Sequence, residues 1–452
     1  MTVVGELAMW IAFFLAAWAS GASFAGRALR RAELVESGAR ATLAAAATTA
    51  LACVGLWAAL LRHDFAVDYV AAHTTMNTPT LYLLTAFWAG RGGRVLWWAL
   101  TLAVCACIVV GARRREGQEP AAPWAVPILA TVLAVALATV CLFWSPFQRV
   151  QWVPAEGRGL APALQNPWAA PYFVTLYPAY ALAIVAVVVG VGAARRARHI
   201  WATAVHGWLL AAWCLATAGI ALRMRWAYSE PALGSGWTWD VAQSATMALW
   251  LVITAVVRSL LVPKVSAESS GAVRRRVPGM YAVYLGAAVL VVGLASQQHW
   301  RQESIRLQPG QAAEARDPYR GRWRFVSQGA SRDERLNYLS TGVAVEAWRG
   351  GANVGIVAAE RRQYLDSGQR PVSEPAMKPG IRSFFALDLY VLLTEVRGEL
   401  AELRLSFRPL VSCVWIGWAI VLGGVIAVVA QLQLAPRAGT RPVGGPAGAS
   451  AG

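Results

Sequence analysis

Nine long apolar stretches, separated by polar loops, dominate the hydrophobic pattern of this chain. Each is about 20 residues long, which is the length an α-helix needs to cross the hydrocarbon core of a bilayer. The predicted spans lie at residues 3–25, 42–61, 95–112, 123–144, 171–193, 205–223, 240–262, 278–296 and 410–431. No small-residue cleavage site follows the first span, so we expect a membrane anchor rather than a cleaved signal peptide.

The segment between the last two spans, residues 297–409, has a different pattern. Its composition is that of a soluble domain, and Val343, Val345 and Ala347 alternate with other positions before the pair Gly350-Gly351. Alternation followed by a glycine turn is typical of a β-hairpin. The predicted fold is an all-α polytopic membrane bundle of about nine transmembrane helices, with a small β-rich soluble domain on its outer face.

The same pattern divides the chain into five parts. Residues 1–262 are expected to form a membrane domain with seven spans, and residues 263–296 a basic cytoplasmic loop and the eighth span. Residues 297–409 form the outer domain and 410–431 the last span. The remainder, 432–452, is rich in Pro, Gly and Ala and is expected to be a disordered cytoplasmic tail.

Basic residues are distributed unevenly between alternate loops. One set of loops carries sixteen of them, whereas the short loops of the other set carry six. Because positive residues favour the cytoplasmic side, the N-terminus is predicted outside and the C-terminus inside. The expected location is a membrane that borders the cytoplasm, with the spans in contact with the lipid bilayer.

Composition narrows the possible functions. Only 14% of the 452 residues are charged and 57% are hydrophobic, whereas a soluble domain has about 25% charged residues. This excludes a cytosolic enzyme, a disordered chain and a secreted protein built on a disulfide scaffold. The net charge of +17 lies in loops between spans rather than on one face, so no nucleic-acid partner is expected. The six cysteines fall in apolar spans without metal or redox spacing and are interpreted as apolar filler, so no metal site is predicted.

Tryptophan is unusually frequent, with 22 residues, and several lie in three predicted outer loops, at 62–94, 145–170 and 224–239. The most informative string is Leu-Gly-Ser-Gly-Trp-Thr-Trp-Asp at 233–240. Gly234 and Gly236 would let the backbone approach a flat ligand, and Trp237 and Trp239 would offer rigid apolar faces. Asp240 would cap the following span or orient the ligand. The alternative is an aromatic belt at the membrane surface with a helix cap.

Two histidines share the first outer loop, and they are the candidate iron ligands that the sequence offers there. His63 and His73 lie ten positions apart. An imidazole nitrogen can bind haem iron. Solvated loop histidines are the other interpretation.

Several strings together resemble the cytochrome c assembly family, in its CcmF/NrfE branch of bacterial haem lyase subunits. The string at 234–240 is similar to that family's Trp-rich haem-handling signature, although Gly236 replaces one Trp. Further similar strings recur in the family's order along most of residues 1–435, among them Trp88-Ala-Gly-Arg-Gly-Gly93, Leu164-Gln-Asn-Pro167, Trp226-Ala-Tyr228 with Glu230, and Asp388-Leu-Tyr390.

The resemblance implies a haem lyase component that works where apocytochrome c receives haem, alongside other cytochrome c maturation membrane subunits. Haem would be a transient substrate or cofactor, held on a shelf formed by the loop at 234–240 and Trp88. In that family, outer histidines ligate this haem, and two further histidines hold a haem b inside the membrane.

The chain departs from the family at these histidine positions. An outer histidine is replaced by Tyr172, and the two membrane histidines by Arg258 and Tyr284. A block of several spans that the resemblance implies after residue 262 is absent, and the chain continues with a segment similar to the family's C-terminal section. Tyrosine can ligate ferric haem, so Tyr172 and Tyr284 are either ligands or aromatic filler. Arg258 is expected to join the cytoplasmic basic edge.

Two functional hypotheses follow from this. In the first, the chain presents haem to apocytochrome c at the outer Trp-rich loop, as a haem lyase does, by orienting the reactants. In the second, it is a non-catalytic, degenerate paralogue that scaffolds a cytochrome assembly or respiratory complex without binding haem. Because the histidines are lost, the sequence does not decide whether the chain is an enzyme, and no catalytic residue is assigned.

Overall fold

The computed structural model describes residues 2–116, 122–193, 198–234, 241–261 and 278–434. Within these ranges, nine helices are long and apolar enough to cross a membrane. They are α1 (Thr2–Ala28), α2 (Ala32–Leu61), α5 (Arg91–Glu116), α6 (Ala125–Phe143), α7 (Ala169–Gly192), α8 (Arg198–Ser229), α9 (Val241–Leu261), α10 (Pro278–Ser296) and α11 (Val411–Leu434). The prediction of about nine spans is confirmed.

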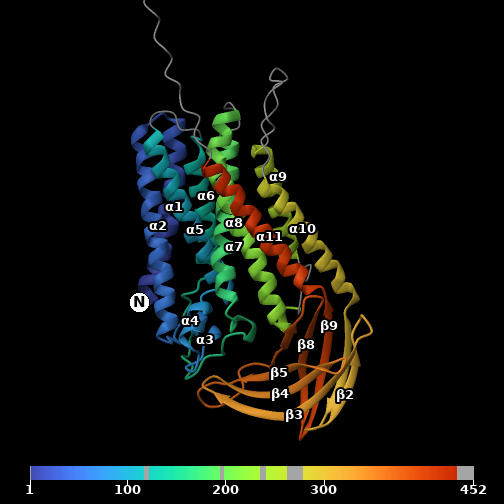
Figure 1. Ribbon diagram of the computed structural model, residues 1–452. Coiled ribbons are helices and arrows are strands. Elements are labelled where there is room, and N and C mark those ends of the chain that lie inside the picture. The colour runs from blue at the N-terminus through green and yellow to red at the C-terminus, as the bar shows by residue number, and fades with distance from the viewer. Residues whose placement is uncertain (1, 117–121, 194–197, 235–240, 262–277, 435–452) are drawn as a thin grey trace, which may run out of the picture.

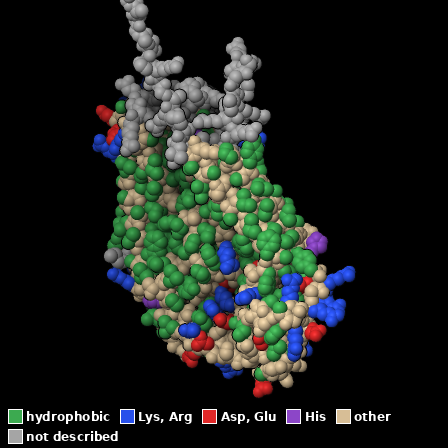
Figure 2. Space-filling view, in the orientation of Figure 1, with side chains coloured by type: hydrophobic (Ala, Val, Ile, Leu, Met, Phe, Trp, Pro, Cys, Tyr) green, Lys and Arg blue, Asp and Glu red, His purple; other side chains and the backbone are tan. Residues whose placement is uncertain are grey.

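These helices form one elongated bundle (Figure 1). Hydrophobic side chains cover its middle, and charged side chains gather mainly toward its two ends (Figure 2). Neighbouring helices pack through small residues, since glycine and alanine let backbones approach closely in lipid. Helices α10 and α11 illustrate this: a Cβ added at Gly286 would lie 2.7 Å from the Gly417 carbonyl oxygen.

Strands fill the segment between α10 and α11, as the alternating pattern predicts. They are β1 (Arg301–Leu307), β2 (Ala312–Arg316), β3 (Arg322–Arg335), β4 (Tyr338–Arg349), β5 (Ala352–Tyr364), β6 (Ala376–Lys378), β7 (Gly380–Ser383), β8 (Leu387–Arg397) and β9 (Leu400–Pro409). Two antiparallel sheets, ordered β1-β9-β8-β7 and β2-β3-β4-β5-β6, enclose an apolar core that includes Trp323, Phe325 and Phe407. We call this unit the β-domain.

The predicted hairpin is confirmed as β4 and β5. Arg349 pairs with Ala352, and the two turn residues Gly350 and Gly351 both have positive φ, at 57° and 88°. Glycine adopts such angles without the steric penalty that a Cβ imposes, and the resulting turn matches the twist of the strands.

The loops predicted to share one side of the membrane meet the β-domain at one end of the bundle, which we call the β-domain end (Figure 1). Five short helices, which the hydrophobic pattern did not predict, lie in the segments at this end. They are α3 (Asp68–His73), α4 (Thr80–Ala86), η1 (Pro162–Leu164), η2 (Pro231–Leu233) and η3 (Gln297–His299).

Polar contacts join these loops to the β-domain. Asn337 donates to Gln165 at 2.8 Å, and Tyr228 donates to Asp388 at 2.6 Å. Burial raises the pKa of Asp388, while this hydrogen bond opposes the rise. Glu156 accepts hydrogen bonds from Ser367, which lower its pKa against the opposing effect of burial.

Two predicted segments lie largely outside the described residues. Of the basic loop beginning at 263, nothing before Pro278 is described, and of the predicted disordered tail only 432–434 are, as the last turn of α11. The division of the chain into five parts stays a prediction.

Candidate functional site

An aromatic cluster at the β-domain end brings together two of the candidate residues. Trp88 stacks on Phe173, with ring centroids 5.8 Å apart and planes within 6°. Phe173 also contacts Tyr172 at 4.9 Å and Trp226 at 5.9 Å. The cluster therefore joins the α4–α5 turn, the first turns of α7 and the last turns of α8, and α8 leads into η2 and the Trp-rich loop.

Trp88 is a buried member of this cluster. Only 5% of its surface is exposed, and one ring face is covered by Phe173. Trp88 is therefore part of the packed interior of the cluster, and a direct contact between Trp88 and haem stays a prediction. Tyr172 is half-buried and contacts Trp226 at 5.6 Å.

The Trp-rich string lies mostly outside the described residues. Gly236, Trp237, Trp239 and Asp240 belong to that undescribed part, so their roles stay predictions. Gly234 is described: it ends η2 with φ at 95°, a left-handed conformation that favours glycine.

His73 is held in a form suited to binding a metal. It ends α3, and its Nδ1 lies 2.7 Å from the Tyr69 carbonyl oxygen. Because a carbonyl oxygen can only accept, Nδ1 carries the proton and Nε2 keeps its lone pair. Burial lowers the pKa of His73 from 6.5, with a smaller contribution from nearby Arg158, so the ring is neutral at pH 7.

His63 has a different environment. It follows α2 in a left-handed conformation, with φ at 50°, and its ring centroid lies 6.1 Å from that of Phe65. Its Nδ1 is buried without a hydrogen-bond partner among the described residues. Since nothing described fixes the proton on either ring nitrogen, the structure favours His73 over His63 as a preorganised ligand.

Tyr284 lies far from this cluster. It is in the first two turns of α10, toward the end of the bundle opposite the β-domain. Arg258, from the last turn of α9, donates to the Tyr284 hydroxyl at 2.6 Å. The structure therefore brings Arg258 and Tyr284 together, whereas it does not bring Tyr284 near Tyr172.

The described residues hold no group of three or more His, Cys, Asp or Glu side chains that could bind a metal ion.

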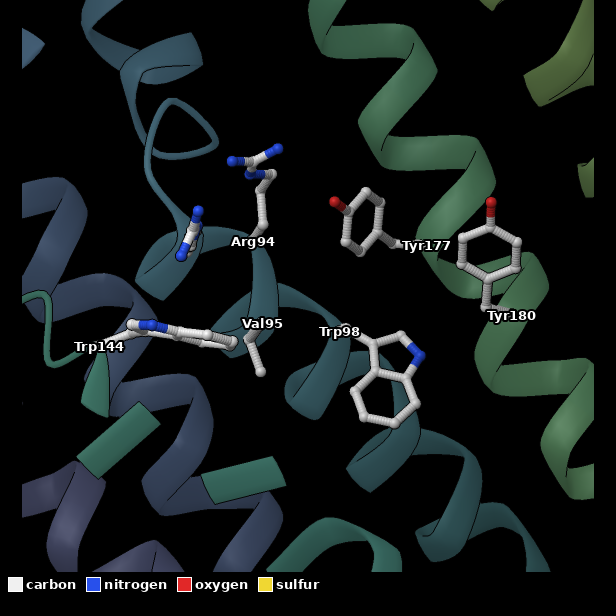
Figure 3. Close-up of a pocket in the computed structure, with 7 residues that line it drawn as sticks. Arg94, Val95, Trp98, Trp144, Tyr177 and Tyr180 are labelled. Carbon is white, nitrogen blue, oxygen red and sulfur yellow. The ribbon is translucent and has the colours of Figure 1, made fainter. Parts of the chain in front are cut away.

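A cavity of about 480 Å³ is shown in Figure 3. It lies next to the aromatic cluster, because its lining residue Tyr177 contacts Phe173 with ring centroids 5.8 Å apart. Its walls come from the first turns of α5, the end of α6 and the middle of α7, and they consist of Arg91, Arg94, Val95, Trp98, Trp144, Tyr177 and Tyr180. We call it the arginine–aromatic pocket. The sequence analysis missed it, although the spacing of 91, 94, 95 and 98 marks one face of a helix.

A buried ion pair involves Glu230, which lies shortly before the Trp-rich string in the sequence, and it was also missed. Lys378 of β6 donates to Glu230 at 2.5 Å, and their side chains are 14% and 1% exposed. Glu230 immediately precedes η2, so the pair connects the base of the Trp-rich loop to the β-domain. The partners are 148 positions apart in sequence, which is why no local pattern predicts the pair.

The fold and this site define a multi-pass membrane protein whose β-domain contacts the loops at the end of the bundle that carries the aromatic cluster. The family model described as "Cytochrome C assembly protein" matches residues 88–298. The resemblance to the CcmF/NrfE family of cytochrome c-type biogenesis proteins is confirmed over this part of the chain.

Curated relatives match part of the chain. The cytochrome c-type biogenesis protein NrfE of Haemophilus influenzae is 33% identical over 202 residues, which are 44% of this chain and 31% of that protein. The probable NrfE of Escherichia coli is 33% identical over 240 residues, 53% of this chain and 43% of that protein. The chain thus matches less than half the length of each.

The fold matches more completely. A solved structure titled "Cytochrome c Heme Lyase CcmF" superposes with a TM-score of 0.74 at 16% sequence identity. The match covers 95% of this chain and 98% of the solved chain. Almost all of that solved fold therefore has a counterpart here, including the bundle and the β-domain, although the sequences have diverged.

Proposed function

We propose that this protein handles haem during cytochrome c maturation, holding it at the β-domain end and presenting it to apocytochrome c. In this proposal the β-domain end faces the periplasm of a bacterial inner membrane, with the N-terminus outside and the C-terminus in the cytoplasm. The uneven distribution of basic loops supports that orientation. The names of the relatives, which are cytochrome c-type biogenesis proteins, support the process. Other maturation subunits would act beside it.

The observation that carries the proposal is that the His73 ring is neutral and that its proton is held on Nδ1 by the bond to the Tyr69 carbonyl oxygen. A neutral imidazole with a fixed Nδ1 proton presents Nε2 to an iron atom. The Tyr69 hydroxyl holds the adjoining turn by donating to the Phe87 carbonyl at 2.7 Å and accepting from the Gly90 amide at 2.9 Å. These bonds tie α3 to the turn that carries Trp88, so the candidate ligand and the aromatic cluster are parts of one rigid unit.

In this proposal the chain acts by positioning. Haem supplies the vinyl groups to which the apocytochrome thiols add, and the aromatic side chains exclude water from the site. The protein lowers the barrier by orienting haem and the thiols toward each other, which can contribute about 7–11 kcal/mol in well-aligned systems. No acid–base group of the chain is assigned to the reaction.

The test is the optical spectrum of the detergent-purified protein, oxidised and reduced, with and without added hemin. We expect a Soret band that is lost or shifted in His73→Ala and kept in His206→Ala, a matched control in α8. His63→Ala and Tyr172→Phe distinguish the other candidate ligands. A protein that binds no haem, or that binds it equally in all variants, would refute the proposed role of His73.

One observation favours the alternative of a scaffold that does not bind haem b in the membrane. Arg258 and Tyr284 occupy the positions where the resemblance implies membrane histidines, and they satisfy each other by a hydrogen bond at 2.6 Å. A guanidinium there disfavours a ferric iron of the same charge sign. Absence of any haem spectrum, together with stable co-purification of other maturation subunits, would favour this alternative.

A further inference from the structure

The arginine–aromatic pocket has two chemically distinct halves. Arg91 and Arg94 lie on one side, three positions apart on the first turns of α5. Trp98, Tyr177 and Tyr180 form the other side and belong to membrane-spanning parts of α5 and α7 (Figure 3). A charged mouth with an aromatic interior fits a ligand that is itself amphipathic.

The two guanidinium groups are held without a carboxylate. Arg91 lies over the Trp144 ring at 5.8 Å. The Arg94 Nε donates to the Gly90 carbonyl at 3.2 Å, and the Arg94 side chain also interacts with the Tyr177 hydroxyl. Within the described part of the chain, neither arginine forms a salt bridge, whereas Arg158 at the same end pairs with Asp68 at 3.3 Å. Both arginines therefore keep N–H donors for an acidic group, and guanidinium binds carboxylate and phosphate well.

The interior is both apolar and fixed. The Tyr180 hydroxyl is bonded to Thr246 of α9 at 2.6 Å, so this ring is held in place by a third helix. The Trp98 and Tyr177 rings are half-buried against the bundle. Such rigid rings offer large contact areas at little entropic cost.

We propose that this pocket binds an acidic amphiphile, with a phosphate or carboxylate head at Arg91 and Arg94 and an apolar body against Trp98, Tyr177 and Tyr180. Two sources share this chemistry: an anionic phospholipid of the surrounding bilayer, and a carboxylate-bearing porphyrin. The second source rests on the proposed function. In either case the acidic head, and not a metal, is the group recognised.

The experiment measures two probes on the full-length protein. Native mass spectrometry compares retention of phosphatidylglycerol and phosphatidylcholine with identical acyl chains, and fluorescence titration measures binding of iron-free protoporphyrin IX. The variants are Arg91→Gln/Arg94→Gln and a matched control, Arg62→Gln, which removes an exposed arginine that follows α2 at the same end. Because protoporphyrin IX has no iron, its binding is independent of whether His73 ligates haem.

We expect the wild-type protein and Arg62→Gln to retain phosphatidylglycerol over phosphatidylcholine, to bind protoporphyrin IX, or both. The double variant should weaken that binding about tenfold or more, as loss of charge-assisted hydrogen bonds does. The probe whose binding weakens in the double variant identifies the source of the ligand: phosphatidylglycerol indicates a lipid of the bilayer, and protoporphyrin IX indicates a porphyrin. Failure to bind either probe selectively, or binding that is the same in the double variant and in Arg62→Gln, would overturn the proposal.

A measurement on the unaltered protein covers the case in which the double variant does not fold. Raising the salt concentration should weaken binding of the acidic probe, because the site opens to solvent and its charges are screened. The single change Arg91→Lys keeps the charge but removes the planar fork, and should reduce affinity less than Arg91→Gln. Binding that depends on neither salt nor the Arg91 variants would contradict the proposed site.

Discussion

Replacing Lys378 with methionine is expected to loosen the contact between the membrane bundle and the β-domain. Glu230 is fully buried, and its described partners are Lys378 at 2.5 Å and the Asn166 amide at 3.4 Å. The second carboxylate oxygen of Glu230 is buried without a partner among the described residues. Without Lys378, the carboxylate keeps one weak hydrogen bond in a site from which water is largely excluded.

The magnitude follows from this burial. Removing one member of a buried ion pair typically costs about 3–5 kcal/mol, because the remaining charge is left uncompensated. At about 1.4 kcal/mol for each factor of ten, the undocked population should rise by roughly a hundred- to a few thousand-fold. Adding Glu230→Gln to Lys378→Met removes the stranded charge and should recover most of the loss.

The assay is hydrogen exchange of the backbone amides in β6 and β7, which report on undocking, together with thermal unfolding in detergent. The matched control is Arg397→Met, which breaks an ion pair with Glu395 at 2.9 Å whose side chains are 77% and 39% exposed. An exposed pair of this kind is worth about 0–1 kcal/mol. If Lys378→Met changes exchange no more than Arg397→Met does, the buried pair does not hold the β-domain in place.

Three further predictions concern close packing and pH. Gly93→Ala should destabilise the protein by about 1–3 kcal/mol in thermal unfolding, because its Cβ would lie 1.8 Å from the Phe87 carbonyl oxygen. Gly286→Ala should do the same, because its Cβ would lie 2.7 Å from the Gly417 carbonyl oxygen and force α10 from α11. Haem binding should persist at pH 6.5 and be lost as the pH falls through the lowered pKa of His73, since only the neutral ring ligates iron; spectra recorded against pH test this.

Two controls separate these packing effects from a general cost of replacing glycine. A Cβ at Gly111 or at Gly423 meets nothing within 4 Å, so alanine there should leave the unfolding temperature unchanged or slightly raised. Equal destabilisation at all four glycines would argue against the packing explanation.

For the pH dependence, haem loss with a midpoint at or above pH 6.5 would show that His73 is not the titrating ligand.

The sequence by itself determined the architecture. A helix satisfies all its backbone hydrogen bonds internally, so apolar runs of about 20 residues specify spans with few alternatives. The turn at Gly350-Gly351 specified a hairpin for a similar local reason, since few residues other than glycine adopt two consecutive positive φ angles. The motifs shared with the family predicted that Trp88 and Tyr172 lie near one haem site. In the structure, the Trp88 and Tyr172 rings both contact the Phe173 ring.

The tertiary structure decided the chemistry of the site. His63 and His73 are equivalent candidates in the sequence, and only the bond from His73 to the Tyr69 carbonyl distinguishes them. The pairs Glu230–Lys378 and Arg258–Tyr284 join separate elements, and no local periodicity reports such contacts. Hydrophobic pattern fixes which segments are buried, but proton placement, ion pairing and cavity shape depend on which segments meet, and that is set by packing across the whole fold.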